Sequence, residues 1–374
     1  MYIVPAFITK HIKFIVPKIL FIVDHRLNRS PSQRYRFEQY LAFFKQSRFD
    51  WELSELINVK DDAIFYNPGH YFGKALIILK SFFIRFKDII RAKNYDIVFI
   101  QREALMIGSS FFEKQFYKRT KTIFDFDDSI WLLDTSPENK KFEFLKNPNK
   151  TSINIAHAHK VIAGNTYLAN YAKQFNKNTV IIPTTIDTDF HKPLPLKKDT
   201  NKVVIGWSGS ISTIMHFESI IPVLKQIILK YPNKIEIHII GQTNYSHSDI
   251  EVISKSWSSE TEVKDLNAFD IGIMPLPDDE WANGKCGLKG LSYMACGVVT
   301  VMAPVGVNTT IINDGVNGFL ASTTQDWIEV LTKLIENPEL RDRIGQAGRA
   351  TVVKNYSVEA NKQYYLDVLN SLIK

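Results

Sequence analysis

Two lysines beside two glycines in the second half of the chain have the spacing of a diphosphate site. Lys285 lies between Gly284 and Gly287, and Lys289 follows one helical turn later. The apolar residues after Gly287 keep a helical spacing up to Gly297, so the pattern predicts a loop that opens a helix. A helix N-terminus attracts anions, whereas a lysine there is otherwise slightly unfavourable. The alternative is that both lysines are simply solvated.

A second candidate phosphate loop follows the first predicted strand of the second half. It reads Ser208-Gly209-Ser210 and precedes a helical pattern. A glycine at such a turn lets backbone N–H groups approach a phosphate, and hydroxyl groups can donate to it. The alternative is that Ser212 or Thr213 only caps the helix.

Three carboxylates in the first half, Asp125, Asp127 and Asp128, follow a predicted strand directly. A carboxylate can orient an attacking hydroxyl or accept its proton. We predict that Asp127 and Asp128 act on an acceptor hydroxyl. Structural capping and a divalent cation are the alternatives.

Arginines near the carboxyl ends of two other strands could bind an oxyanion. Ser32, Arg34 and Arg36 open a helix after the first strand, and Arg102 ends a central one. Guanidinium groups suit phosphate or carboxylate because they donate two parallel hydrogen bonds. The alternatives are a solvated basic helix face and, for Arg102, an ion pair with Glu103.

The elements that must position these residues alternate between short β-branched or aromatic runs and amphipathic helical runs. This alternation predicts an α/β protein with parallel sheets, in which ligands bind at the carboxyl ends of the strands. The predicted strands are residues 19–24, 97–101, 122–125, 160–163, 180–182, 203–207, 235–240, 252–256, 271–274 and 298–302.

The length of 374 residues predicts two domains. The linker is expected in the proline- and lysine-rich stretch 183–200, which lacks a hydrophobic period. We predict domains over residues 1–183 and 184–355. The segment 356–374, with a last helix over 358–373, is expected to pack back on the first domain.

Composition restricts the class of protein. Apolar residues make up 45% of the chain and charged residues 23%, as in ordinary globular proteins. The only cysteines, Cys286 and Cys296, do not form a disulfide framework, which suits a reducing compartment. The segment 1–17 is interpreted as neither a signal peptide nor a spanning helix. No nucleic-acid-binding motif is recognised.

A basic and apolar helical pattern covers residues 74–93. It suits a helix lying on an anionic membrane leaflet. The alternative, which we favour from sequence alone, is a surface helix whose apolar stripe faces its own sheet.

Several ordered motifs carry a family resemblance. The stretch 285–318 contains the pattern Gly-Leu-x-x-Leu-x-Tyr-Met-Ala-x-Gly, followed by Pro304-Val305-Gly306-Val307-Asn308 and by Asn313-Asp314-Gly315-Val316-Asn317-Gly318. Further blocks are 30–36, 101–103, 125–131 and 163–168. Together they look like family-four glycosyltransferases of a bacterial polysaccharide-biosynthesis type. The resemblance implies a GT-B fold, with two Rossmann-like doubly wound domains facing a central cleft, and a retaining reaction.

The sequence departs from that family at two positions. Many members carry two glutamates eight residues apart, one at the donor sugar and one at the nucleotide ribose. Gly284 and Ser292 stand there in this chain. Ser292 could still bond a ribose hydroxyl, but the donor-sugar contacts must differ or the activity is altered. The nearby acids Asp278, Asp279 and Glu280 either substitute for the lost carboxylate or are solvated.

The resemblance and the motifs together predict transfer of a sugar from a nucleoside-diphosphate sugar to a hydroxyl of a glycan or lipid-linked acceptor. The donor would be bound by the second domain and the acceptor by the first. The predicted donor contacts are Ser208, Gly209, Ser210, Lys285, Cys286, Gly287, Leu288, Lys289 and Ser292. The predicted acceptor or phosphate contacts are Ser32, Arg34, Arg36 and Arg102.

No permanently bound cofactor, no metal and no nucleic acid are expected. The expected location is the cytoplasm, with peripheral contact at the inner, anionic face of the membrane as an option. Two alternatives stay open: a non-catalytic GT-B protein that binds a sugar nucleotide, and a sugar-nucleotide epimerase. The absence of a histidine from the motifs weighs against the epimerase.

Overall fold

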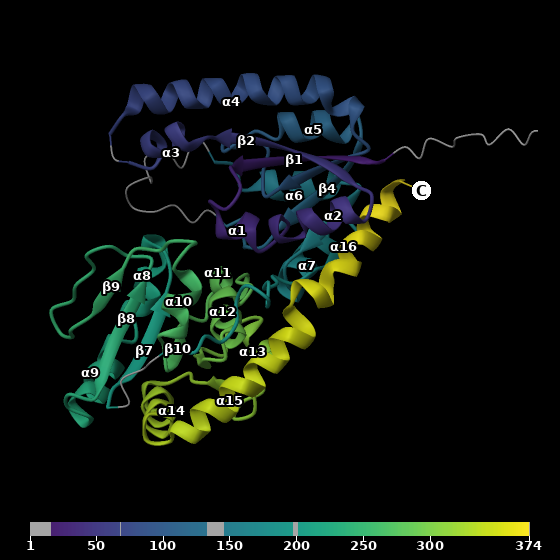
Figure 1. Cartoon of the computed structure of the whole chain (residues 1–374). Helices are drawn as coiled ribbons and strands as arrows, with labels where there is room; N and C mark the ends of the chain where they lie inside the picture. The colour runs from purple at the N-terminus through teal and green to yellow at the C-terminus, as the bar shows by residue number, and fades with distance from the viewer. Residues whose placement is uncertain (1–15, 68, 133–145, 197–200, 374) are drawn as a thin grey trace, which may run out of the picture.

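The computed structural model describes residues 16–67, 69–132, 146–196 and 201–373. Two six-stranded parallel sheets organise this part of the chain, with strand orders β2-β1-β3-β4-β5-β6 and β12-β11-β10-β7-β8-β9 (Figure 1). Each sheet carries helices on both faces, so the predicted α/β class is confirmed. We refer to the halves built on the two sheets as the first lobe and the second lobe.

The first lobe contains β1 (Lys18–His25), β2 (Asp50–Ile57), β3 (Ile97–Gln101), β4 (Lys121–Phe126), β5 (Lys160–Ala163) and β6 (Thr179–Ile181). Alternate residues of β1 point to opposite faces, as strand geometry requires: Leu20 and Ile22 enter one core and Phe21 and Val23 the other. The first of these cores is covered by α4 (Tyr71–Arg91), α5 (Phe111–Tyr117), α6 (Asn149–His157) and α7 (Thr166–Lys173). The second core contains α2 (Leu41–Gln46) and the final helix α16 (Val358–Ile373). The short helices α1 (Pro31–Arg34) and α3 (Val59–Phe65) complete the lobe.

The second lobe contains β7 (Val203–Ser208), β8 (Ile235–Ile240), β9 (Ile253–Lys255), β10 (Ile271–Met274), β11 (Val299–Met302) and β12 (Phe319–Leu320). Its helices are α8 (Ile214–Glu218), α9 (Ile221–Lys230), α10 (Glu262–Asn267), α11 (Glu280–Asn283), α12 (Leu288–Ala295), α13 (Asn308–Ile311), α14 (Thr324–Glu336) and α15 (Pro338–Thr351). Buried residues of α9 and α14, such as Leu224 and Leu331, share one core with β7 and β10.

The end of the chain crosses from the second lobe to the first (Figure 1). After α15 a π-helical segment, Val352–Tyr356, leads into α16. The Tyr365 hydroxyl donates to the carbonyl oxygen of Arg36 at 2.6 Å, and its ring lies 4.5 Å from the ring of Tyr40. The last helix, which follows the helices of the second lobe in the chain, therefore supplies core residues to the first lobe.

The strand predictions agree closely with the structure, with two omissions. β3, β5, β8 and β10 have the predicted bounds, and the last helix coincides with α16. β2 was missed because Asp50, Glu52 and Glu55 interrupt its apolar residues, and charged residues are common at the edge of a sheet. β12 was missed because it has two residues and is defined by its pairing with β11.

Cys286 and Cys296 are free and buried, which confirms that they form no disulfide. Within the described ranges, no single helix is long and apolar enough to cross a bilayer. The bent pair Ile211–Glu218 and Ile221–Lys230 passes that test together, on length and composition alone.

Candidate active site

A cavity of about 400 Å³ lies between the two lobes, beside the carboxyl ends of strands from both sheets. This volume is within the range of small-molecule sites. The predicted site residues that line it are Ser32, Arg34, Arg102, Asp127, Asp128, Ser208, Gly209, Ser210, Lys285, Cys286, Gly287, Leu288, Lys289 and Ser292. The fold thus brings together two groups of residues that are distant in the sequence.

Arg36 is the predicted site residue that does not line the cavity. Its guanidinium is fully buried, with Nε 3.2 Å from both carboxylate oxygens of Asp125, and it donates to the carbonyl of Ile182. Burial raises the pKa of Asp125, although the charge of Arg36 opposes this shift. The prediction that Arg36 binds an acceptor or a phosphate is therefore wrong. It neutralises a buried carboxylate at the end of β4.

The N-terminus of α12 opens on the cavity. Gly287 precedes it with φ +70°, a left-handed backbone conformation that favours glycine, and a Cβ there would also displace the end of the Ile311 side chain. Among the described residues no side chain caps this helix. The first N–H groups of an α-helix have no partner within the helix, and here they lie beside an open cavity. This end of α12 can accept an anion.

Lys285 and Lys289 stand at this helix end. Nζ of Lys285 lies 2.9 Å from Oδ1 of Asp128, and the ammonium group of Lys289 lies 5.3 Å from the centre of the Trp207 ring. Burial and the neighbouring charge of Lys285 lower the pKa of Lys289 to about 8, although Asp128 opposes the shift. Two cations at the positive end of a helix are stabilised when an anion enters between them. The alternative that both lysines are simply solvated is therefore wrong, because each contacts a specific side chain.

The loop after β7 differs from the prediction in its hydrogen bonding. The N–H of Ser208 donates to the Tyr293 hydroxyl at 2.8 Å, and the N–H of Gly209 donates to the carbonyl of Ile240 at 2.9 Å. These two amides are therefore already paired and are not the free phosphate donors that the sequence suggested. The hydroxyl of Thr213 bonds to the carbonyl of Ser210 at 3.0 Å rather than capping a helix.

The carboxylates after β4 are held by a cation from β3. Arg102 donates to Asp127 at 2.8 Å and to Asp128 at 2.9 Å, and Ser32 donates to Asp127 at 2.7 Å. Burial would raise the pKa of Asp127, but the charges of Arg102 and Arg36 and these hydrogen bonds outweigh burial and lower it. Asp127 is therefore an ionised group of fixed position and a weak acceptor of protons.

Arg34 contacts the second lobe across the cavity. It forms an ion pair of 2.7 Å with Glu262 and lies 4.9 Å from the centre of the Trp257 ring. Trp257 is 38% exposed and lines the cavity. Sequence reasoning missed Glu262, since an acid at the start of a helical pattern usually indicates only a helix N-terminus.

The position of the first missing glutamate is closed by the other lobe. A Cβ at Gly284 would lie 2.0 Å from Oγ of Ser129 and 2.8 Å from its backbone nitrogen. Asn165, also missed as an individual contact, donates to the carbonyls of Gly284 and Lys285 at 3.1 and 3.0 Å. The Cys286 thiol donates to the carbonyl of Asp127 at 3.3 Å. This loop is thus fixed against the first lobe by several contacts.

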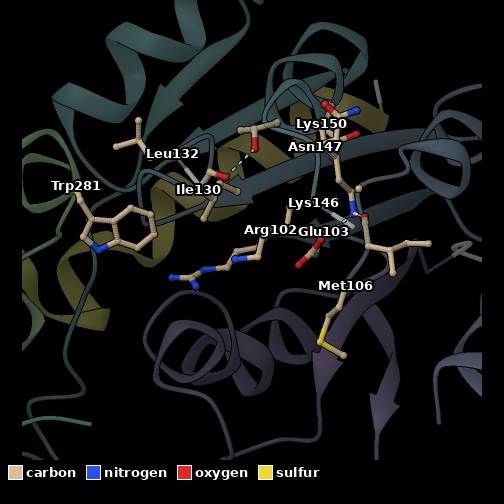
Figure 2. A pocket seen from close by; sticks show the side chains of 13 residues that line it. Arg102, Glu103, Met106, Ile130, Leu132, Lys146, Asn147, Lys150 and Trp281 are labelled. Atoms are coloured by element: carbon tan, nitrogen blue, oxygen red, sulfur yellow. Dashed lines mark hydrogen bonds and ion pairs between the residues drawn. The ribbon is translucent and has the colours of Figure 1, made fainter. Parts of the chain in front are cut away.

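A smaller pocket of about 210 Å³ adjoins Arg102 on the first-lobe side (Figure 2). Trp281 of α11 lies at one end of it and Met106 at the other. Lys150 lies along its wall, where Nζ bonds to Glu103 and to the carbonyl of Ile107, each at 2.8 Å. The pocket therefore continues the cleft beyond the Arg102 side chain. In the parts of the chain that the structure describes, no group of three His, Cys, Asp or Glu side chains is arranged to hold a metal ion.

Residues 267–351, which include α12 and both lysines, match the protein family described as "Glycosyl transferases group 1". This region of the chain is therefore similar to that family. A D-inositol 3-phosphate glycosyltransferase of Nocardioides sp. is 35% identical to it over 88 residues. The alignment covers 23% of this chain and 19% of that relative.

The fold outside this group 1 region is shared with solved structures. Sucrose-phosphate synthase from Thermosynechococcus elongatus superposes with a TM-score of 0.71 and 13% identity, over 95% of this chain and 99% of that one. Anabaena Alr3699/HepE, solved in complex with UDP-glucose, gives a TM-score of 0.65 and 16% identity, again over 95% and 99%. The GT-B fold, two Rossmann-like lobes around a cleft, is confirmed.

Proposed function

We propose that this protein is a glycosyltransferase that moves a sugar from a nucleoside-diphosphate sugar to a hydroxyl of a glycan or lipid-linked acceptor. The observation that supports this most is the pairing of two chemistries across one cavity. The uncapped N-terminus of α12 with Lys285 and Lys289 faces the ionised Asp127 and its neighbour Asp128. A sugar-nucleotide donor is supported by the group 1 match over the residues that include α12 and both lysines. It is also supported by the UDP-glucose bound to HepE.

The donor diphosphate would lie at the start of α12. Lys289 would bind it directly, and Lys285 would exchange Asp128 for a phosphate oxygen. The lowered pKa of Lys289 would rise on binding, because the anion replaces a cation as its nearest charge. Helix N–H groups and two ammonium groups would together stabilise the negative charge on the leaving diphosphate.

In the reaction the bond between the anomeric carbon and the diphosphate oxygen breaks, and the acceptor oxygen forms the new bond to that carbon. The diphosphate oxygen leaves with the bonding electrons and takes up the proton that the acceptor hydroxyl loses. Because the pKa of Asp127 is lowered, we assign to Asp127 and Asp128 the orientation of the acceptor hydroxyl rather than removal of its proton. Retention at the anomeric carbon is part of the proposal, and NMR of the product linkage tests it.

The same proposal assigns roles to the parts of the chain. Residues 1–183 would bind the acceptor, residues 184–355 the donor, and the segment 356–374 would fix one lobe to the other. The pocket beside Arg102 is a suitable place for the acceptor's own sugar or phosphate, since Lys150 and Arg102 line it with apolar groups. No resident cofactor or metal is required. We place the protein in the cytoplasm, at the inner face of the membrane.

The test is release of free nucleoside diphosphate from a panel of sugar nucleotides in the presence of a membrane lipid extract. One donor should be turned over by the wild type and about 100-fold more slowly by Lys289→Gln. The control Lys362→Gln, at a lysine that pairs with Glu359 within α16 and does not line the cavity, should behave as wild type. Binding of a donor is followed separately by the rise in melting temperature that ligands cause.

A second candidate, a non-catalytic protein that binds a sugar nucleotide, is favoured by one observation. The Ser129 contact leaves no room for a side chain at Gly284, where many related enzymes carry a glutamate for the donor sugar. If a donor raises the melting temperature and no acceptor extract gives turnover, this second function replaces the first. If no donor binds, both are wrong.

A further inference from the structure

Helix α4 buries Ile77 and Ile89 on its inner face, together with the charged pair Arg85 and Asp88, and exposes a second set of apolar side chains on its outer face. Phe72, Phe83 and Ile90 are 79%, 67% and 71% exposed, whereas Arg85 and Asp88 are 0% and 1% exposed. The outer face of a surface helix in a soluble domain is normally polar. The interpretation that we favoured from sequence, an apolar stripe facing its own sheet, holds for one face of the helix, which includes Ile77 and Ile89. It is wrong for the opposite face, whose apolar side chains lie in solvent.

The buried contacts of Arg85 fix this orientation. Its guanidinium donates to the carbonyl of Val23 at 2.7 Å, to the carbonyl of Ser54 at 3.1 Å and to Asp88 at 2.8 Å. Rotating α4 to bury its apolar face would break all of these bonds and leave a buried charge without a partner, which is strongly unfavourable. The helix is therefore held with its apolar face outward.

The exposed apolar residues form one continuous surface, which we call the α4 stripe: Phe72, Leu76, Leu79, Phe83, Phe86 and Ile90. Consecutive members are three or four residues apart, so they share one face of the helix. At 1.5 Å per residue the stripe is about 27 Å long. Phe111 of α5 extends it sideways, because its ring lies 6.1 Å from that of Phe86 and is 47% exposed.

The exposed charges of α4 and α5 themselves are positive, while the acids Asp61 and Glu52 of neighbouring elements are paired with Lys80 and Arg91 of α4. Asp88 and Glu113, the acids of α4 and α5, are both buried. Lys87 and Lys93 are exposed along and just beyond α4, and Lys118 with its neighbour Arg119 is exposed just after α5. An apolar stripe flanked by cations matches the interface of a bilayer that contains anionic lipids.

We propose that the α4 stripe docks this protein on an anionic bilayer surface, with α4 lying in the plane of the interface. A second copy of the chain fits less well, because pairing two stripes would bring two sets of lysines together.

α4 lies on the outer side of the first lobe, away from the second (Figure 1). It lies between β2 and β3 in the chain, and these strands belong to one parallel sheet. The start of α4, near Phe72, therefore lies toward the carboxyl ends of the strands, which border the cleft.

One part of the proposal, the delivery of an acceptor, rests on the proposed function. An acceptor anchored in the bilayer would meet the rim of the cleft next to the first turn of α4. The docking itself follows from the surface alone and does not require the chemistry to be correct.

The test is co-sedimentation of the full chain with vesicles of phosphatidylcholine, with and without phosphatidylglycerol. The wild type should bind the anionic vesicles. Phe83→Gln/Ile90→Gln should lower the partition coefficient by at least about tenfold, the effect of withdrawing one large apolar side chain from the interface. The matched control is Leu229→Gln, because Leu229 on α9 is equally exposed, at 74%, but lies in the second lobe.

The electrostatic part is tested with Lys87→Gln/Lys93→Gln. Binding to anionic vesicles should fall by about fivefold for each lysine, and added salt should reduce this difference. The same substitutions should leave any residual binding to pure phosphatidylcholine unchanged.

Three results would overturn the proposal. The wild type could fail to bind anionic vesicles. The protein could form a dimer that Phe83→Gln/Ile90→Gln dissociates, without any binding to vesicles. That variant could instead unfold at a clearly lower temperature than Leu229→Gln, which would mean that the stripe is covered within the chain. Release of nucleoside diphosphate in the presence of detergent-solubilised lipid extract instead of vesicles, measured on the same variant, separates these outcomes from failure of the proposed chemistry.

Discussion

Lys285 and Asp128 form an ion pair across the cleft, with 2.9 Å between Nζ and Oδ1. The other oxygen of Asp128 accepts a hydrogen bond from Arg102, also at 2.9 Å. The loop before α12 is thereby tied to the loop after β4. Lys285, which we propose binds the donor, and Asp128, which we propose binds the acceptor, are therefore paired with each other when no ligand is bound.

Asp128→Asn should separate binding from turnover. Loss of the ion pair frees Lys285, so donor affinity should rise by up to about fivefold, the range for a partly exposed pair. Turnover should fall by about 100-fold if Asp128 orients the acceptor. Calorimetric titration with donor and the rate of diphosphate release measure the two effects. Asp367→Asn on α16 is the control, and equal loss of both quantities would show that Asp128 has only a structural role.

Lys289 should make stability and donor binding depend on pH in opposite directions. Its pKa is lowered from 10.5 to about 8, so between these values the unfolded chain binds more protons than the folded one. The free energy of unfolding should therefore rise with pH across this window. Affinity for a diphosphate should fall as pH rises above about 8, because the folded, ligand-free lysine becomes neutral.

Lys289→Met provides the direct measurement. At pH 7 it should stabilise the ligand-free protein by about 1 kcal/mol or more, because one unit of pKa corresponds to that energy. It should also abolish the rise in stability between pH 8 and 10.5 and weaken diphosphate binding about tenfold. Urea unfolding at several pH values tests the first two effects. Lys354→Met, at an exposed lysine, should keep the wild-type profile.

Arg36→Met should destabilise the chain without a direct effect on ligands. It leaves Asp125 buried and unpaired, for which we expect a loss of about 3–5 kcal/mol. Adding Asp125→Leu should recover much of that loss, because the buried charge is then removed as well. Lys362→Ala, which breaks the exposed pair with Glu359, should cost at most about 1 kcal/mol. A similar loss in Arg36→Met and Lys362→Ala would contradict this account.

Gly284→Ala should open the cleft. The new Cβ would meet Oγ of Ser129 at 2.0 Å and the backbone nitrogen of Ser129 at 2.8 Å, so the lobes must move apart. The radius of gyration from X-ray scattering should increase, while secondary structure by circular dichroism stays unchanged. Ser129→Gly in the same chain should restore the closed form in part, because it removes the hydroxyl and leaves the backbone contact. An unchanged radius of gyration would show that the loop adjusts locally.

The sequence determined the local elements of this protein. Gly287 and Gly297 flank α12 with positive φ values of 70° and 74°, a backbone conformation that glycine adopts without strain, and the helix therefore begins and ends where its glycines predict. Buried strands such as β10 were predicted with their bounds because all of their side chains are apolar or small. The resemblance in the group 1 region likewise depends on short-range motifs.

Only the tertiary structure decided which charged groups face the cleft. Arg34 and Arg36 are two residues apart, yet one contacts Glu262 across the cavity and the other is buried on Asp125. Arg102 holds Asp127 and Asp128 because β3 and β4 are neighbours in the sheet. In the same way, the periodicity of α4 predicts an apolar stripe but not the direction that it faces. That direction follows from the buried bonds of Arg85, because pairing a buried charge outweighs hiding apolar side chains from water.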